Sequence, residues 1–376
     1  MTENNIKLNA DIYSLLEEFL GHLSERERDI LIRRFQLRVQ PKKETLKQIG
    51  DDYKITRERV RQIEKDSIKK LKEKASLKSE FQSIALAVED FLNLHGGLAE
   101  ENYLFENILN KLALEDPKSA EDRDLVRRIV HFLMDQLFDQ FERIEESENY
   151  FPIWKLENAK LDEVKSYLEE INTGLEKTEQ ALKHEDFINY LKTHESFEKR
   201  KDMFNQIKEQ SILELENILL SYVKLTKRIK QNLFQEWGLI EWSRIQPKKL
   251  SEKINLILEK EKKPLHFNEI AEFINTASFD KKNICAATVH NELISNINYV
   301  LVGRGIYALK GWGYQDGTVL DVITIILDKS DKSLSKEEIF ENVLKQRMVR
   351  KATIYLALMN KEKFEKMEDG TYKLKK

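Results

Sequence analysis

The sequence predicts a mostly α-helical protein of several domains, with a helix-turn-helix near the N-terminus followed by tandem winged helices. Three observations support this fold class. Apolar residues recur at helical spacing through most of the chain. Two short helical segments within 44–65 are separated by a turn. Near the C-terminus, a unit of three helical segments and a β-hairpin occurs twice, at a constant offset of 65 residues.

Composition describes a helix-rich globular protein. A chain of 376 residues suggests roughly two to four domains. No segment approaches the ~20 apolar residues of a membrane span, and residues 1–5 lack the basic start of a secretory signal. We therefore expect a cytoplasmic protein that does not contact a membrane. The single cysteine, Cys285, excludes an intramolecular disulfide and a multi-cysteine zinc site, and we expect it to be a small buried residue.

The net charge of −3 hides a strong segregation of charge along the chain. Residues 21–80 carry 18 Lys/Arg against 11 Asp/Glu, whereas residues 81–190 carry 11 against 25. Residues 191–376 return to a net charge of +7. The basic N-terminal segment suits contact with phosphates, while the acidic middle would be repelled by DNA and is expected to face protein or solvent.

The helix-turn-helix is the most informative segment. Its two helices share a small predicted core, made by Leu46, Ile49, Tyr53, Ile55, Val60, Ile63 and Leu71. Thr56 is placed to cap the second helix, so that the charged residues after it fall on the exposed first turns, the part that enters the major groove in this motif. The predicted DNA-binding residues are Thr56, Arg57, Glu58, Arg59, Arg61, Gln62 and Lys65.

The chemistry of this face indicates sequence choice. Arginine can bind guanine O6 and N7, glutamate can accept from cytosine N4, and glutamine can pair with adenine. The alternative is a solvated helix face with charge pairs between successive turns, which is what most charge-rich helix surfaces are.

Three ordered blocks of sequence, at 24–28, 31–37 and 45–64, resemble region 4 of the vegetative bacterial sigma factors over roughly residues 10–80. This resemblance implies a domain that recognises the promoter −35 element and docks on the flap of the RNA polymerase β subunit. It assigns base and phosphate contacts to Arg57, Glu58, Arg61 and Gln62, with Arg59 beside them. One departure is Gln36, where the family usually has Gly, which affects the local turn more than the DNA surface.

The same resemblance suggests which residues contact the polymerase. The amphipathic segments around Leu15, Leu16, Phe19, Leu31 and Phe35 resemble the part of region 4 that docks on the flap. The alternative is that they form the core of this domain. A complete sigma factor also has upstream domains that melt the promoter, whereas here the region 4-like block begins almost at the N-terminus. We therefore expect no promoter melting of the usual kind.

The C-terminal repeat predicts two winged helices, at 247–315 and 316–376. In each copy, two helical segments precede a third, expected to be capped by Thr288 or Thr353. A hairpin follows, turned at 303–305 or 369–370. Residues 247–315, through the blocks 264–271, 288–293 and 299–313, also resemble the HARE-type winged helix found in the RNA polymerase delta subunit. That resemblance implies interaction with protein or nucleic acid, and it predicts fold better than activity.

The middle of the chain fits the same pattern less closely. Amphipathic helices are predicted at 98–112 and 124–138, followed by a hairpin over 141–156. These elements indicate an acidic winged-helix-like domain at 83–158, after a helix-turn-helix domain at 1–82. Residues 159–246 are expected to form a helical connector or a degenerate winged helix.

Candidates for catalysis are weak. His266 and His290 lie near Glu269 and Glu292, but no second motif supplies a nucleophile or a set of metal ligands, and a phosphate-binding loop is absent. We expect no enzyme activity, cofactor, metal or small-molecule substrate. The C-terminal winged helices are expected to add affinity without adding much sequence choice. Their candidate phosphate or partner contacts are Arg304, Arg347, Arg350 and Lys351.

Together these features predict a DNA-binding transcription regulator that reads a −35-like element in double-stranded DNA and contacts RNA polymerase. Two alternatives remain open from the sequence. One is a polymerase-binding modulator of the delta-subunit type with little sequence preference. The other is the DNA-binding accessory of a restriction or modification system whose catalytic subunit is another chain.

Overall fold

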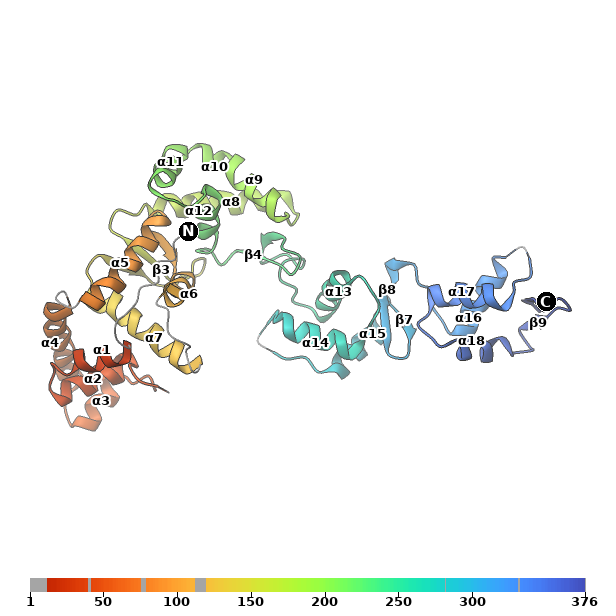
Figure 1. Ribbon diagram of the computed structural model, residues 1–376, viewed down its shortest axis with the longest axis horizontal. Coiled ribbons are helices and arrows are strands. Elements are labelled where there is room, and N and C mark those ends of the chain that lie inside the picture. Colours follow the sequence, from red (N-terminus) through yellow and green to blue (C-terminus); the bar gives the residue numbers. More distant parts are fainter. Residues whose placement is uncertain are drawn as a thin grey trace. The chain divides into compact units, whose positions relative to one another are not determined.

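The computed structural model describes residues 12–39, 42–75, 79–111, 120–280, 282–330 and 332–375. Within these ranges the protein is mostly helical with small antiparallel sheets, as predicted (Figure 1). The chain divides into two compact units, Met1–Ile229 and Lys230–Lys376. The boundary between the units falls inside residues 159–246, which the sequence analysis treated as one helical connector or degenerate winged helix.

The first unit begins with four helices, and the turn between the third and fourth completes the predicted helix-turn-helix. Ser24 with Glu27 and Thr45 with Gln48 form capping boxes, which satisfy backbone N–H groups at the starts of the second and third helices. Ile30, Ile49 and Val60 are buried at their junction. The helices are α1 (Ile12–Leu20), α2 (Glu25–Phe35), α3 (Leu46–Tyr53) and α4 (Arg57–Ala75).

A three-stranded sheet with three helices and a π-helical turn follows. The strand order is β1-β3-β2, with Phe141 opposite Leu156, so the predicted hairpin is confirmed. The helix predicted at 98–112 begins later, because residues 98–100 pair with β3. The helix predicted at 124–138 becomes π-helical after Phe132. The elements are α5 (Ser79–Leu94), β1 (Leu98–Glu100), α6 (Glu101–Lys111), α7 (Ala120–Phe132), η1 (Leu133–Leu137), β2 (Phe141–Ile144) and β3 (Ile153–Leu156).

One continuous hydrophobic core joins these two groups of elements, running from α1 to β3. The rings of Phe35 on α2 and Phe132 on α7 lie 4.9 Å apart between centroids. Arg128 on α7 donates to the carbonyl oxygens of Gln36 and Arg38, just after α2. Helix α5 begins at Ser79 and continues past residue 83.

Five more helices complete the first unit. Phe197 and Phe204 stack with ring centroids 5.0 Å apart, and Tyr167 packs edge-on against Phe204. The Ser211 hydroxyl donates to the Leu94 carbonyl oxygen and so links this layer to α5. The helices are α8 (Leu161–Thr178), α9 (His184–Thr193), α10 (Glu195–Glu198), α11 (Lys201–Gln210) and α12 (Leu215–Val223).

The second unit opens with a short two-stranded sheet and continues with a three-stranded sheet ordered β6-β8-β7. The turn between β7 and β8 contains Gly305 at φ +70°, as expected for a tight hairpin. The elements are β4 (Ile229–Gln231), β5 (Trp237–Leu239), α13 (Leu250–Glu261), β6 (Leu265–His266), α14 (Phe267–Ala277), α15 (Ala286–Ser295), β7 (Tyr299–Gly303), β8 (Ile306–Leu309) and the 3₁₀ turn η2 (Lys310–Trp312).

The last part of the chain repeats this order of elements with a reduced sheet. Leu334 forms an isolated bridge with Tyr372, at the place that β6 occupies in the preceding repeat. The Met348 N–H donates to the Val302 carbonyl oxygen at 2.7 Å, which joins the two repeats. The elements are α16 (Val319–Asp328), α17 (Lys336–Gln346), α18 (Lys351–Leu358), β9 (Phe364–Lys366) and β10 (Tyr372–Leu374).

Three local expectations in this unit were wrong. Thr288 and Thr353 lie inside the first turns of α15 and α18 rather than at their caps, because these helices begin at Ala286 and Lys351. Cys285 is exposed rather than buried, since it occupies the N-cap position of α15, outside the core.

Candidate nucleic-acid interface

The turn between α3 and α4 sets the direction of α4. Lys54 ends α3 in the left-handed conformation at φ +53°, and the Ile55 N–H donates to the Gly50 carbonyl oxygen at 2.9 Å. A Cβ atom on Gly50 would lie 2.7 Å from the Ile55 carbonyl oxygen. Only a glycine fits this close approach of helix and turn without a shift of the backbone.

Thr56 caps α4 as the sequence predicted, because its hydroxyl accepts from the Arg59 N–H at 3.2 Å. The cap fixes where the helix begins and therefore which side chains occupy its first turns. All seven predicted DNA-binding residues are exposed and lie on the cap and the first half of α4, as a single surface that we call the α4 face: Thr56, Arg57, Glu58, Arg59, Arg61, Gln62 and Lys65.

Charged groups on the α4 face pair with one another in the free protein. Glu58 accepts two hydrogen bonds from Arg61 Nε, at 3.1 and 2.9 Å, and one from Arg61 Nη2 at 2.6 Å. The Arg61 hydrogen bonds lower the pKa of the Glu58 carboxyl below its usual value. Arg59 Nη1 donates to Gln62 Oε1 at 3.1 Å. Such solvent-exposed contacts are weak, so bases or phosphates can replace them at small cost.

Two arginines on α2 hold the neighbouring helices, Arg34 through α4 and Arg33 through α3, and the sequence did not reveal this role. Arg34 Nε donates to Glu64 on α4 at 2.9 Å, and its Nη1 donates to the Glu44 carbonyl oxygen at 3.1 Å. Arg33 Nε donates to the Glu44 carboxylate at 2.9 Å, and Arg33 also pairs with Asp52 on α3. Hydrogen bonding to Glu44 raises the pKa of Arg33 above its usual value. Both cations therefore position helices rather than offer charge to a partner.

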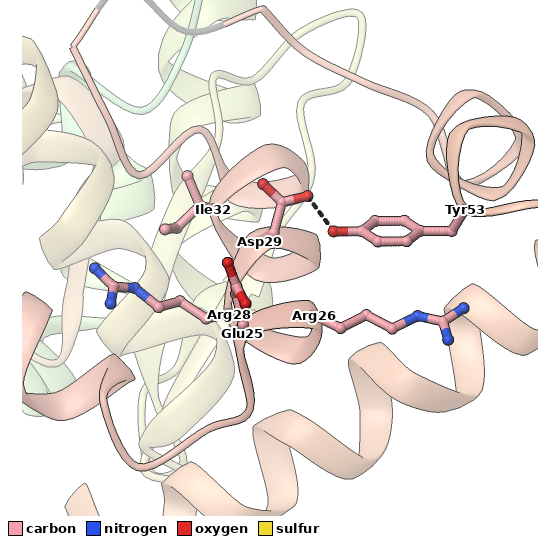
Figure 2. Close-up of a pocket in the computed structure, with 6 residues that line it drawn as sticks. All are labelled: Glu25, Arg26, Arg28, Asp29, Ile32 and Tyr53. Carbon is pink, nitrogen blue, oxygen red and sulfur yellow. Dashed lines mark hydrogen bonds between the residues drawn. The ribbon is translucent and has the colours of Figure 1, made fainter.

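A polar open pocket of about 580 Å³ lies between α2 and the end of α3 (Figure 2). The Tyr53 hydroxyl donates to Asp29 Oδ2 at 2.8 Å, and the Arg26 guanidinium carbon lies 5.0 Å from the Tyr53 ring centroid. In Figure 2, Arg26 and Arg28 extend to opposite sides. The lining residues are Glu25, Arg26, Arg28, Asp29, Ile32 and Tyr53.

The apolar residues that the sequence offered as a polymerase dock are mostly inside the first unit. Leu15, Leu16, Phe19 and Leu31 are buried, and Phe35 packs against the same core. The alternative that the sequence left open, a role in the protein's own core, is the one that their burial supports.

The second group of candidate contacts is divided by the fold. Arg304, Arg350 and Lys351 are exposed. Arg347 is only 3% exposed, and its guanidinium donates to the carbonyl oxygens of Leu301, Gln315 and Gly317. Its charge is used to join the two repeats of the second unit, so Arg347 does not offer the phosphate or partner contact that was expected of it.

Among the residues that the structure describes, no helix is long and apolar enough to cross a membrane. Within the same ranges, no group of three His, Cys, Asp or Glu side chains could hold a metal ion. His266 does not approach a carboxylate as an acid–base pair would. Its Nδ1 accepts from the Asn268 N–H at 3.2 Å, as the N-cap of α14.

The fold of α3 and α4 and the α4 face together define a helix-turn-helix protein. Residues 19–73 match sigma-70, region 4, and form a domain of that kind. The RNA polymerase sigma factor RpoD of Helicobacter pylori (strain ATCC 700392 / 26695) is 42% identical over 65 residues, which are 17% of this chain and 10% of that protein. The RNA polymerase sigma factor RpoS of Coxiella burnetii (strain RSA 493 / Nine Mile phase I) is 41% identical over 64 residues, 17% of this chain and 18% of that protein.

The chain thus spans less than a fifth of the length of these relatives. No solved structure matches the chain significantly.

Proposed function

We propose that the protein is a transcription regulator that binds double-stranded DNA through the α4 face and reads a −35-like promoter element. The observation that carries this proposal is the α4 face itself, which belongs to a sigma-70 region 4 domain and exposes all seven of its polar side chains. Arg57, Glu58 and Gln62 offer the donors and acceptors that distinguish base pairs in the major groove. Arg59, Arg61 and Lys65 add cations for phosphates.

We also propose contact with RNA polymerase, since the similar proteins are RNA polymerase sigma factors by name. The β flap is the expected partner, from the resemblance to region 4. Because the apolar residues of α1 and α2 are buried, an exposed surface has to make this contact. The polar pocket of Figure 2 fits that role, because Glu25 and Arg26 are exposed at it, with Arg26 over the Tyr53 ring. Arg28, which also lines the pocket, pairs with Glu17.

The rest of the chain supports a finer proposal about its domains. The order helix, strand, helix, helix, strand, strand occurs at 79–156 and 250–309, each time with the first strand paired to the last. Residues 319–374 follow the same order with a bridge in place of the first strand. We propose winged helices there, of HARE type at 247–315. Arg304 in that domain, and Arg350 and Lys351 in the last one, contact phosphates or a partner.

Selection of bound duplexes from a random DNA pool, followed by footprinting, tests the proposed function with the full-length chain. A reader of the proposed kind yields a defined site, protected on its major-groove edges. Failure to enrich any sequence at fixed salt would contradict it and would favour the polymerase modulator of delta-subunit type. A pull-down of purified core polymerase, with Arg26→Ala as a variant of the polar pocket, tests the polymerase contact separately.

A second candidate function has one observation in its favour. Helix α15, at the position of the recognition helix of the proposed HARE-type domain, contains no lysine or arginine. A modulator that contacts protein needs no cations there. Copurification with polymerase without a defined DNA site is the result that this candidate predicts, whereas copurification with a nuclease would indicate the restriction or modification accessory.

A further inference from the structure

The exposed side of α18 is unlike the α4 face. We define the α18 face as Arg350, Lys351, Tyr355, Leu356 and Met359, which are exposed on α18 and at its two caps. Leu356 is 69% exposed, Met359 58% and Tyr355 41%. Residues four positions apart lie on one side of a helix, so Lys351, Tyr355 and Met359 form one row, with Leu356 beside it. Three bulky apolar side chains therefore stand together in solvent.

The chemistry of this surface does not suit base reading. Helix α4 exposes Arg57, Glu58 and Gln62 at its start, each able to hydrogen-bond a base edge. The apolar side chains of the α18 face can only contact a thymine methyl group in a groove. Clustered exposed apolar residues are instead typical of surfaces that bind protein.

Charge around α18 specifies the partner further. Residues 342–361 contain five Lys/Arg and no Asp/Glu, in a chain with 66 acidic residues. Three of these cations, Arg350, Lys351 and Lys361, are exposed. Lys345 is exposed but pairs with Glu341 at 2.8 Å, and Arg347 is buried. Lys336 lies 4.4 Å from the Tyr355 ring centroid and adds a further positive charge at the edge. The α18 face thus has an apolar centre with positive charges around it. A partner has to be complementary to both.

The first unit gives a precedent for such use of the third helix. Helix α7 holds the same place in the order of elements as α18. There Phe132 packs against Phe35, and Arg128 donates to the Gln36 carbonyl oxygen beyond α2. In this chain, then, a third helix already binds another protein segment through an aromatic residue and an arginine.

We propose that the α18 face is a docking site for a protein segment that combines acidic with bulky apolar residues. Acidic side chains of the partner pair with Arg350 and Lys351, and its apolar residues cover Tyr355, Leu356 and Met359. The site lies outside the sigma-70 region 4 domain, so it gives the protein a partner that is separate from DNA.

A displayed library of random peptides, selected on the immobilised full-length chain, tests this proposal. The chain with Leu356→Ser and Met359→Ser serves for counter-selection. Both residues are exposed, so the double substitution should leave the melting temperature unchanged. Ile212→Ser is the matched control, because Ile212 is 80% exposed in the first unit. Enriched peptides are expected to combine Asp or Glu with Phe, Leu or Trp.

The double variant should bind the selected peptides about tenfold more weakly or worse, and Ile212→Ser should bind as the wild type does. Lys351→Gln should weaken binding and flatten its salt dependence. The proposal is overturned if no enriched peptide distinguishes the double variant from wild type, or if the enriched peptides lack acidic residues. Equal loss of affinity for a random-sequence DNA duplex in the double variant would also overturn it, since α18 would then be a nucleic-acid surface.

Discussion

At the scale of single residues, two backbone positions of the region 4 domain carry unusual constraints. Gly50 lies where α3 meets the turn, and Gln36 ends α2 at φ +59°, a conformation that side chains with a Cβ rarely adopt. The Gln36 carbonyl oxygen also accepts from Arg128, so the strained position is tied to α7. Each position gives a direct prediction.

Gly50→Ala should destabilise the first unit and weaken specific DNA binding. Alanine gains about 1 kcal/mol of helix propensity. Overpacking against the Ile55 carbonyl oxygen, 2.7 Å away, costs about 1–3 kcal/mol and tilts α4. Chemical unfolding and DNA titration measure both effects. Gly311→Ala is the control, because no atom lies within 4 Å of its added Cβ. Unchanged stability in Gly50→Ala would show that the turn tolerates a side chain.

Gln36→Gly should stabilise the protein by about 0.5–1 kcal/mol, since glycine adopts the left-handed conformation without the Cβ clash but loses more chain entropy on folding. The hydrogen bond from Arg128 is made to the main chain and should survive the substitution. The midpoint of urea unfolding is the measurement. A lower midpoint in the variant would mean that the Gln36 side chain stabilises the protein by more than its left-handed backbone conformation destabilises it.

At the scale of elements, a half-buried histidine on α7, His131, makes stability depend on pH. His131 Nε2 lies 3.6 Å from Glu101 Oε2, which also accepts from Arg143 at 2.5 Å and from Trp154 at 3.1 Å. Burial lowers the pKa of His131 below its usual 6.5, although Glu101 and Asp135 oppose this shift, and Arg143 and Arg127 add to it. Burial likewise lowers the pKa of His95.

Because both histidines hold a proton less tightly when folded, their contribution to stability is fully present above pH 6.5. It is lost as the pH falls below 6.5 and through the folded pKa values. We expect the free energy of unfolding to decrease over that window and the decrease to be smaller in His131→Asn. His22→Asn, at an exposed position, should follow the wild type. Equal slopes in all three proteins would contradict this account of the buried histidine.

The elements also show what a sequence pattern can and cannot predict. The helix-turn-helix, the Thr56 cap and the hairpin over 141–156 follow from local periodicity and turn chemistry. The burial of Arg347 and the bracing by Arg34 depend on residues 30 or more positions away, which periodicity does not report. Strand β1 looked helical because its pairing with β3 overrides local preference.

The α4 face was predictable because its function needs exposed polar residues on a capped helix. The ion pair between Glu58 and Arg61 on this face was harder to predict from the sequence. Glu58 and Arg61 lie three positions apart, a spacing that suits a solvated charge pair as well as a DNA contact. In the free protein the pair forms, as the interpretation of a solvated charge pair expects, and the proposed contact with DNA would replace it.

At the scale of the whole molecule, the α4 face lies in the first compact unit and the α18 face in the second. Deleting residues 230–376 should therefore preserve the preferred DNA site. The α4 face lies entirely in the first unit, and so does Arg34, which donates to Glu64 on α4. The same deletion should abolish capture of acidic, apolar peptides. Selection from a random DNA pool with the shortened chain is the measurement. If the shortened chain selects a different DNA sequence, the second unit determines the sequence preference and the region 4 domain has another role.

The central claim is that the α4 face reads base sequence, and binding to single-base-pair variants of the selected duplex tests it most directly. Arg57→Ala and Glu58→Ala should each lose about 1–3 kcal/mol of discrimination at one base pair, at fixed salt, and little elsewhere. Glu58→Ala also frees Arg61 for phosphates, so its non-specific affinity should not fall. Lys69→Ala, exposed further along α4, should keep the whole preference. If Arg57→Ala and Glu58→Ala both retain the wild-type preference and affinity, α4 is not the recognition helix.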